Sequence, residues 1–176
     1  MVTFQGNYIL LSNFVNKRKT KRDMDKESFI KEEVPAKLNE LSEKAAPQWG
    51  ILTPQAMVEH LVSSWRLANG KAEAKCEMPQ EKLKAYRDFL FSDQSFEKNI
   101  KNPALPENET PKLRKSSLKE ATEQLVGEIE DFFEFFKQNP SAQPEHPVFG
   151  ALDKEGWLIF QYKHITHHFR QFNLID

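Results

Sequence analysis

The stretch that decides the fold is SLKEATEQLVGEIEDFFEFFKQ, residues 117–138. Its apolar side chains recur every three or four residues, which is the period of one face of an α-helix. They are Leu118, Ala121, Leu125, Ile129, Phe132, Phe133 and Phe136. Ser117 and Glu120 have the spacing of a capping box, in which each side chain satisfies a free N–H group of the first turn. Asn139 and Pro140 end the pattern. The stretch therefore predicts one long core helix.

Similar signals predict helices over residues 53–69, 79–91 and 153–173. Thr53 and Asp153 are residue types that cap helix N-termini, and Gly70 is typical of a helix end. Residues 25–46 also have helical spacing, but Pro35 lies inside them. Because proline breaks a helix interior and suits a first turn, we expect one helix to end near Val34 and another to begin at Pro35.

These helices predict an all-α fold, most simply a four-helix bundle. No segment after residue 23 favours a β-strand. Residues 92–116 hold Pro103, Pro106 and Pro111 among polar residues. A connection of this length is typical of the crossover between the second and third main helices of a bundle.

The composition limits the class of protein. The chain has 176 residues, enough for one domain. Its 25 Lys+Arg and 26 Asp+Glu give a net charge of -1, which argues against a nucleic-acid partner. No apolar run approaches the roughly 20 residues that cross a bilayer, and the single Cys76 excludes an intrachain disulfide. We expect a cytoplasmic protein, monomeric or homodimeric, that does not bind a membrane.

Residues 1–23 do not share the helical pattern, which opens near Met24. We interpret them as an extension outside the native fold, and residues 24–176 as the domain. The basic run KRKTKR, residues 17–22, is interpreted as a solvated charge run rather than a nucleic-acid-binding tail.

Three histidines form the candidate site. His164 and His168 are four residues apart on the helix predicted at 153–173, so their imidazoles can hold one metal ion. His60 lies on the apolar face of the helix predicted at 53–69. Three histidines from two helices would leave coordination positions for water or substrate, as in catalytic metal sites. Two alternatives remain open: the pair could be exposed, and His167 could replace His168. His146 is interpreted as a hydrogen-bonded turn residue.

Four short stretches resemble the DinB-like (YfiT-like) superfamily of metal-dependent hydrolases and thiol transferases. They are QWG at 48–50, PQAMVEHL at 54–61, HPxFGxL at 146–152 with Trp157 after it, and HxxHHFRQF at 164–172. The resemblance covers residues 25–174. It implies a four-helix bundle with a crossover and a divalent ion, often nickel or zinc, held by histidines that match His60, His164 and His168. Arg170 stands one position later than the arginine of the common superfamily ending.

Two reactions fit such a site. A three-histidine set suits Zn, Ni or Fe, and the ion could activate water for hydrolysis or a low-molecular-weight thiol for transfer to a small electrophilic substrate. The superfamily resemblance favours the thiol. Glu59 projects about 100° from His60 around the helix and is a poor general base. The alternative is a non-catalytic, stress-related protein that binds a metal or a small molecule.

Overall fold

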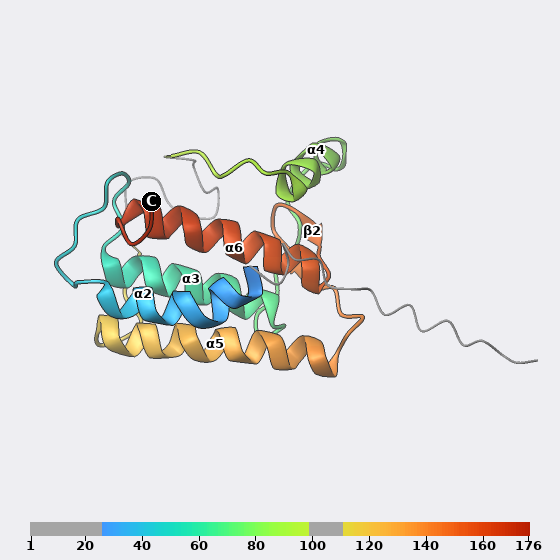
Figure 1. Cartoon of the computed structure of the whole chain (residues 1–176). Helices are drawn as coiled ribbons and strands as arrows, with labels where there is room; N and C mark the ends of the chain where they lie inside the picture. The colour runs from blue at the N-terminus through green and yellow to red at the C-terminus, as the bar shows by residue number, and fades with distance from the viewer. Residues whose placement is uncertain (1–25, 99–110) are drawn as a thin grey trace, which may run out of the picture.

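The computed structural model describes residues 26–98 and 111–176 and is mostly helical, which confirms the all-α class (Figure 1). The predicted extension at 1–23 and residues 99–110 of the predicted crossover lie outside the described residues. The elements are η1 (Phe29–Glu33), α2 (Val34–Glu40), α3 (Pro54–Ala68), α4 (Gln80–Phe91), α5 (Leu118–Gln138), β1 (Glu145–His146), β2 (Gly150–Ala151) and α6 (Lys154–Gln171).

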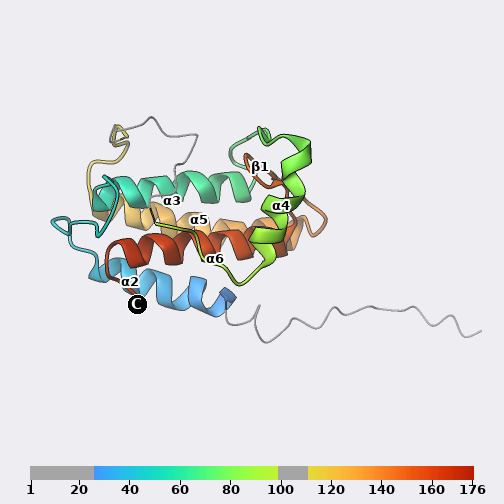
Figure 2. The same cartoon turned by 90° about the horizontal axis from the view of Figure 1, so that it is seen from above.

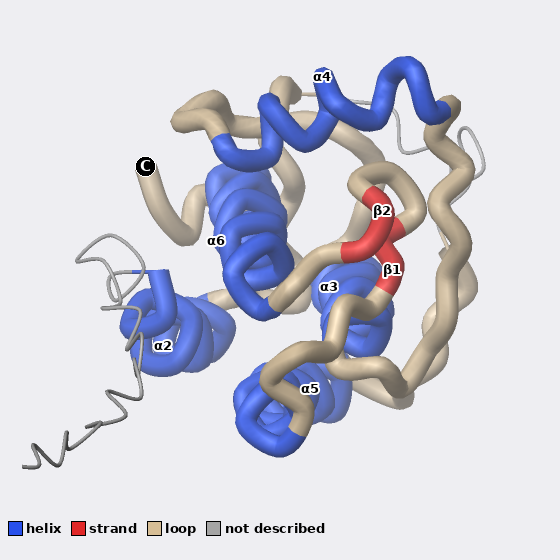
Figure 3. The backbone as a smooth tube through the Cα atoms, turned by 90° about the vertical axis from the view of Figure 1, so that its right-hand side faces the viewer, coloured by secondary structure: helices blue, strands red, loops and turns tan. Residues whose placement is uncertain are grey.

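Four helices lie side by side with similar axes: α2, α3, α5 and α6 (Figures 1 and 2). Helix α4 crosses them near one end (Figure 3). Where α3 packs on α5, the Trp65 and Phe132 rings meet edge to face with centroids 5.1 Å apart. None of the described helices is long and apolar enough to cross a membrane.

The predicted caps place the helix starts correctly. Thr53 Oγ1 accepts from the N–H of Ala56, and Asp153 Oδ1 accepts from the N–H of Gly156. Ser117 Oγ accepts from the N–H of Glu120, but the Glu120 carboxylate accepts from the N–H and hydroxyl of Ser116 instead of the N–H of Ser117. The capping-box prediction is therefore correct in one of its two hydrogen bonds.

Pro35 lies in the first turn of α2, as predicted, but the helical backbone is not interrupted before it. The backbone stays helical through Pro35, and the turn before it widens into the π-helical segment η1. The N–H of Val34 donates to Phe29 O, five residues back. Because proline has no N–H, the carbonyl four residues before it loses its usual donor, and the wider turn accommodates this loss. Helix α2 ends at Glu40, earlier than the predicted residue 46.

A hairpin whose two strands have two residues each was not expected from the sequence. Strands β1 and β2 are antiparallel, with Glu145 opposite Ala151 and His146 opposite Gly150. Arg87 of α4 donates to the carbonyls of Phe149 and Ala151, so this hairpin ties α4 to the start of α6.

Candidate metal centre

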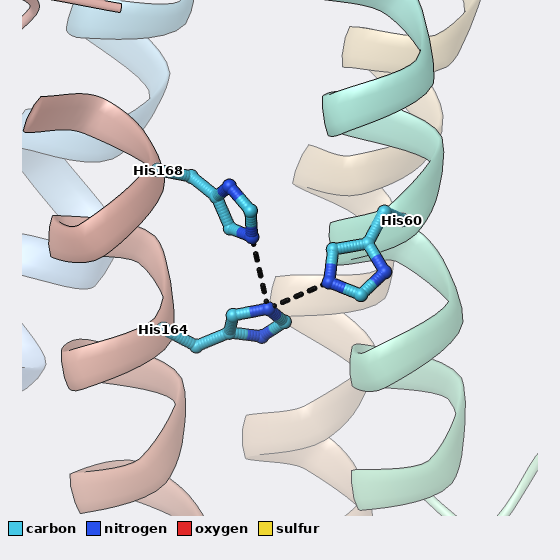
Figure 4. Close-up of side chains that lie close together, drawn as sticks. All are labelled: His60, His164 and His168. Carbon is cyan, nitrogen blue, oxygen red and sulfur yellow. Dashed lines mark hydrogen bonds between the residues drawn. The ribbon is translucent and has the colours of Figure 1, made fainter. Parts of the chain in front are cut away.

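Three histidine rings converge between α3 and α6 (Figure 4). His164 Nε2 lies 2.8 Å from His60 Nε2 and 3.2 Å from His168 Nε2. One possible ligand atom from each of the three rings lies within 4.8 Å of the other two. The three residues predicted from the sequence as metal ligands therefore form one group.

The packing of α3 on α6 brings them together. His60 faces His164, and one turn further along α3, Ser64 Oγ donates to Gln161 Oε1 of α6 at 3.1 Å. The residue number rises from 60 to 64 on α3 while that of its partner on α6 falls from 164 to 161, so the two helices are antiparallel. His168 lies one turn beyond His164 on the same face of α6.

All three imidazoles are held in the neutral form, which is the form that binds metal. Burial, with the nearby charges of Arg114 and His167, lowers the pKa of partly exposed His60 to about 4. Burial, with the repulsion that protonated His60 and His167 rings would exert, lowers the pKa of His168 to about 3. Burial and the neighbouring histidines lower the pKa of His164 well below its usual value. At neutral pH the three rings offer lone pairs rather than positive charges.

Gln171 fixes the tautomer of His168. The side-chain amide of Gln171 donates from Nε2 to Trp49 O at 2.6 Å, so its Oε1 faces His168 Nδ1 at 2.8 Å. His168 must then carry its proton on Nδ1, which leaves the Nε2 lone pair directed at the other rings. Gly50 has a φ of +76°, and a Cβ there would lie 2.8 Å from Gln171 Nε2. The QWG stretch thus supports the ring of His168 through Gln171.

The donor set fits a divalent metal ion. A tetrahedral ion with metal–nitrogen distances of about 2.0–2.1 Å separates its nitrogens by about 3.3 Å. The two short Nε2–Nε2 distances, 2.8 and 3.2 Å, lie within about half an ångström of that value. His164 Nδ1 is buried without a hydrogen-bond partner among the described residues. A ring that gives Nε2 to a metal carries its proton on Nδ1 and usually donates it to a partner, so within the described part of the chain His164 lacks the supporting contact that Gln171 gives His168.

The remaining two histidines stay outside the group. His167 packs against Trp49 and Phe96, with ring centroids 5.6 and 6.1 Å apart, so the geometry favours His168 as the ligand. His146 accepts at Nδ1 from the N–H groups of Val148 and Phe149, which confirms the hydrogen-bonded turn. Burial lowers the pKa of His146 to about 3.

Glu59 is a structural carboxylate. It accepts from Gln55 Nε2, from Arg114 N and Nε, and from the N–H of Lys115. Burial alone would raise its pKa, but these hydrogen bonds outweigh burial and lower it. The carboxylate therefore holds the chain before α5 against α3. Sequence reasoning missed Arg114, because a residue 55 positions from Glu59 shares no local pattern with it.

Comparison with known proteins gives a partial family match. The model of a family described as "Protein of unknown function (DUF1569)" matches residues 100–174. These residues include His164 and His168 but not His60. No curated protein and no solved structure matches the chain.

Proposed function

We propose that the protein is a metal-dependent enzyme of the DinB-like superfamily. In this proposal it transfers a low-molecular-weight thiol to a small electrophilic substrate, or hydrolyses such a substrate. The observation that carries the proposal is the convergence of three neutral imidazoles, those of His60, His164 and His168, between two helices. The parallel axes of α2, α3, α5 and α6 support the four-helix bundle that the resemblance implies (Figure 2).

The residues of the chain have separate tasks in this proposal. His60, His164 and His168 hold one divalent ion through Nε2, and Gln171 keeps the ring of His168 turned towards it. The ion would supply a coordination position where a thiol or a water molecule loses its proton near neutral pH. His60 is the partly exposed member of the group, so its side of the centre faces the approaching substrate.

The carboxylates favour thiol transfer over hydrolysis. Hydrolysis commonly needs a general base beside the attacking water, whereas a thiolate is already the reactive form. The ligand group found in the described part of the chain contains histidines and no Asp or Glu. Glu59, the carboxylate next to His60 in sequence, is occupied by Gln55, Arg114 and Lys115.

Metal analysis followed by an activity assay tests the proposal. The purified protein should contain about one divalent ion per chain and should consume a model electrophile in the presence of a small thiol. His60→Ala should remove both properties, since three nitrogens fall to two. His167→Ala is the matched control, because it deletes a neighbouring imidazole outside the group and should keep both.

Each result separates one function from another. Metal retained by a His60, His164 and His168 triple alanine variant would place the ion elsewhere and end the proposal. Metal bound at the three histidines without turnover across a panel of thiols and esters would favour the second candidate, a non-catalytic metal-binding protein.

A further inference from the structure

The guanidinium of Arg114 lies along α3 beside His60. Its Nη2 donates to Glu59 O and to Ser63 Oγ, and its Nε donates to Glu59 Oε2 at 3.2 Å. These acceptors come from the residue before His60 and from the residue three after it. On a helix Ser63 lies about 60° and Glu59 about 100° from His60, so the guanidinium lies on the flank of α3 next to the face that bears His60.

This guanidinium is fixed yet accessible. The backbone N–H of Arg114 also donates to Glu59 Oε2, at 2.7 Å, so main chain and side chain are anchored together. The side chain is nevertheless 54% exposed. Its second terminal nitrogen, Nη1, makes no hydrogen bond to the part of the chain that the structure describes. A guanidinium held in place with an unused N–H pair is suited to bind a planar or tetrahedral anion.

Arg114 forms an ion pair with Glu59, so its attraction for an anion comes from the unused N–H pair and not from an excess of positive charge. Glu59 is the carboxylate that contacts Arg114, and it is already shared with Gln55 and with the N–H of Lys115. The three imidazoles are neutral and contribute no charge. The charge of Arg114 is felt at His60, where it disfavours protonation of the ring. An anion at the guanidinium would therefore lie on the His60 side of the centre.

We propose that Arg114 selects anionic substrates, binding a carboxylate or sulfonate of the thiol while the thiol sulfur occupies the metal centre. The inference rests on the proposed function, since it requires an ion at the three histidines. It adds the substrate class: a small thiol that carries a negative group, in preference to a neutral thiol with the same carbon chain.

Two thiols with the same two-carbon chain test the proposal on cobalt(II)-loaded protein. The probes are 2-mercaptoethanesulfonate and 2-mercaptoethanol, whose binding is followed by the visible spectrum of the cobalt. The sulfonate is a poor metal ligand, so any preference for it reports the protein. We expect the anionic thiol to bind more tightly than 2-mercaptoethanol. Arg114→Gln should lower the affinity for the anionic thiol about tenfold or more, and should change the affinity for 2-mercaptoethanol less than about twofold.

Two further variants keep the test decisive. Arg170→Gln is the matched control, because Arg170 is exposed and donates from Nε to Asp176 O, and it should keep the preference. Arg114→Lys keeps the positive charge but not the paired N–H groups of a guanidinium. It should lose only part of the preference for the anionic thiol, and it remains informative if Arg114→Gln folds poorly. If Arg114→Gln weakens the binding of both thiols equally, or if the unaltered protein shows no preference, the inference is overturned while the proposed function stands. Failure to bind cobalt at all would remove the proposed function and the inference with it.

Discussion

Gln171 is the single side chain on which the geometry of His168 depends most directly, because one amide contacts both the imidazole and the carbonyl of Trp49. We expect Gln171→Leu to lower metal affinity about 10- to 100-fold, the usual effect of removing a partner of a metal-bound histidine. Competition with a chromophoric chelator measures this. Gln138→Leu, which removes an exposed glutamine of α5, is the control. A change below about threefold in Gln171→Leu would mean that packing alone orients the ring.

Gly50 and Gly127 make a matched pair. Gly50 has a φ of +76°, and a Cβ would press on Gln171, so Gly50→Ala should lower the free energy of unfolding by about 1–2 kcal/mol. Gly127 lies inside α5 with nothing within 4 Å of the added Cβ, so Gly127→Ala should raise it by about 0.5–1 kcal/mol. Urea unfolding measures both. A change in the free energy of unfolding of the same sign in both variants would contradict the inference that Gly50 needs its positive φ and its missing Cβ.

The sequence predicted the three grouped histidines but not the residues around them. His164 and His168 are four apart on one helix, so local periodicity was enough to pair them, and His60 lay on an apolar stripe. The contacts of Gln171 with Trp49 and of Arg114 with Glu59 join distant parts of the chain. Only the packing of the helices creates such contacts, and no local spacing records them.

At the scale of elements, α6 carries two of the three histidines and begins at the Asp153 cap. Asp153→Ala should lower the free energy of unfolding by about 1 kcal/mol, because the N–H of Gly156 loses its acceptor. Asp153→Asn should change it by a few tenths only, since asparagine caps equally well. Thermal unfolding followed by circular dichroism compares them. A loss in the asparagine variant equal to that in the alanine variant would assign the effect to charge instead of capping.

The elements that the sequence predicted well are those with a strong local signal at each end. Helices α3, α5 and α6 begin where Thr53, Ser117 and Asp153 place them. The π-helical turn before Pro35 and the β1–β2 hairpin were missed. The first depends on how the packed helix absorbs a lost hydrogen bond, and the second on only two residues per strand, too few for an alternating pattern.

At the scale of the whole molecule, buried Glu128 links α5 to the end of α3, accepting from Arg66, Asn69 and Lys71. Burial alone would raise its pKa, but these partners outweigh burial and lower it from 4.5. A lowered pKa stabilises the fold above the unfolded value, and this stability is lost as the pH falls through the folded value.

We therefore expect Glu128→Gln to lower the free energy of unfolding by about 1–3 kcal/mol at pH 7. The difference from the unaltered protein should shrink as the pH falls below 4.5. Urea titrations at several pH values measure it, and Glu130→Gln, on the exposed side of α5, is the control. A difference that stays constant down to pH 3 would show that the ionised form of Glu128 is not what stabilises the fold.

His60 and His164 are 104 residues apart in the chain, although their Nε2 atoms nearly touch. An ion shared by them would act as a cross-link that closes a very long loop. Cross-links of this kind lower the conformational entropy of the unfolded chain more than those that close short loops. Metal would then protect the protein against heat: the midpoint of thermal unfolding should rise with zinc concentration, because an ion that binds only the folded state shifts the equilibrium towards it. The midpoint of His60→Ala should not respond to zinc in this way. A cell short of metal would hold this chain in a less stable form, more open to proteolysis.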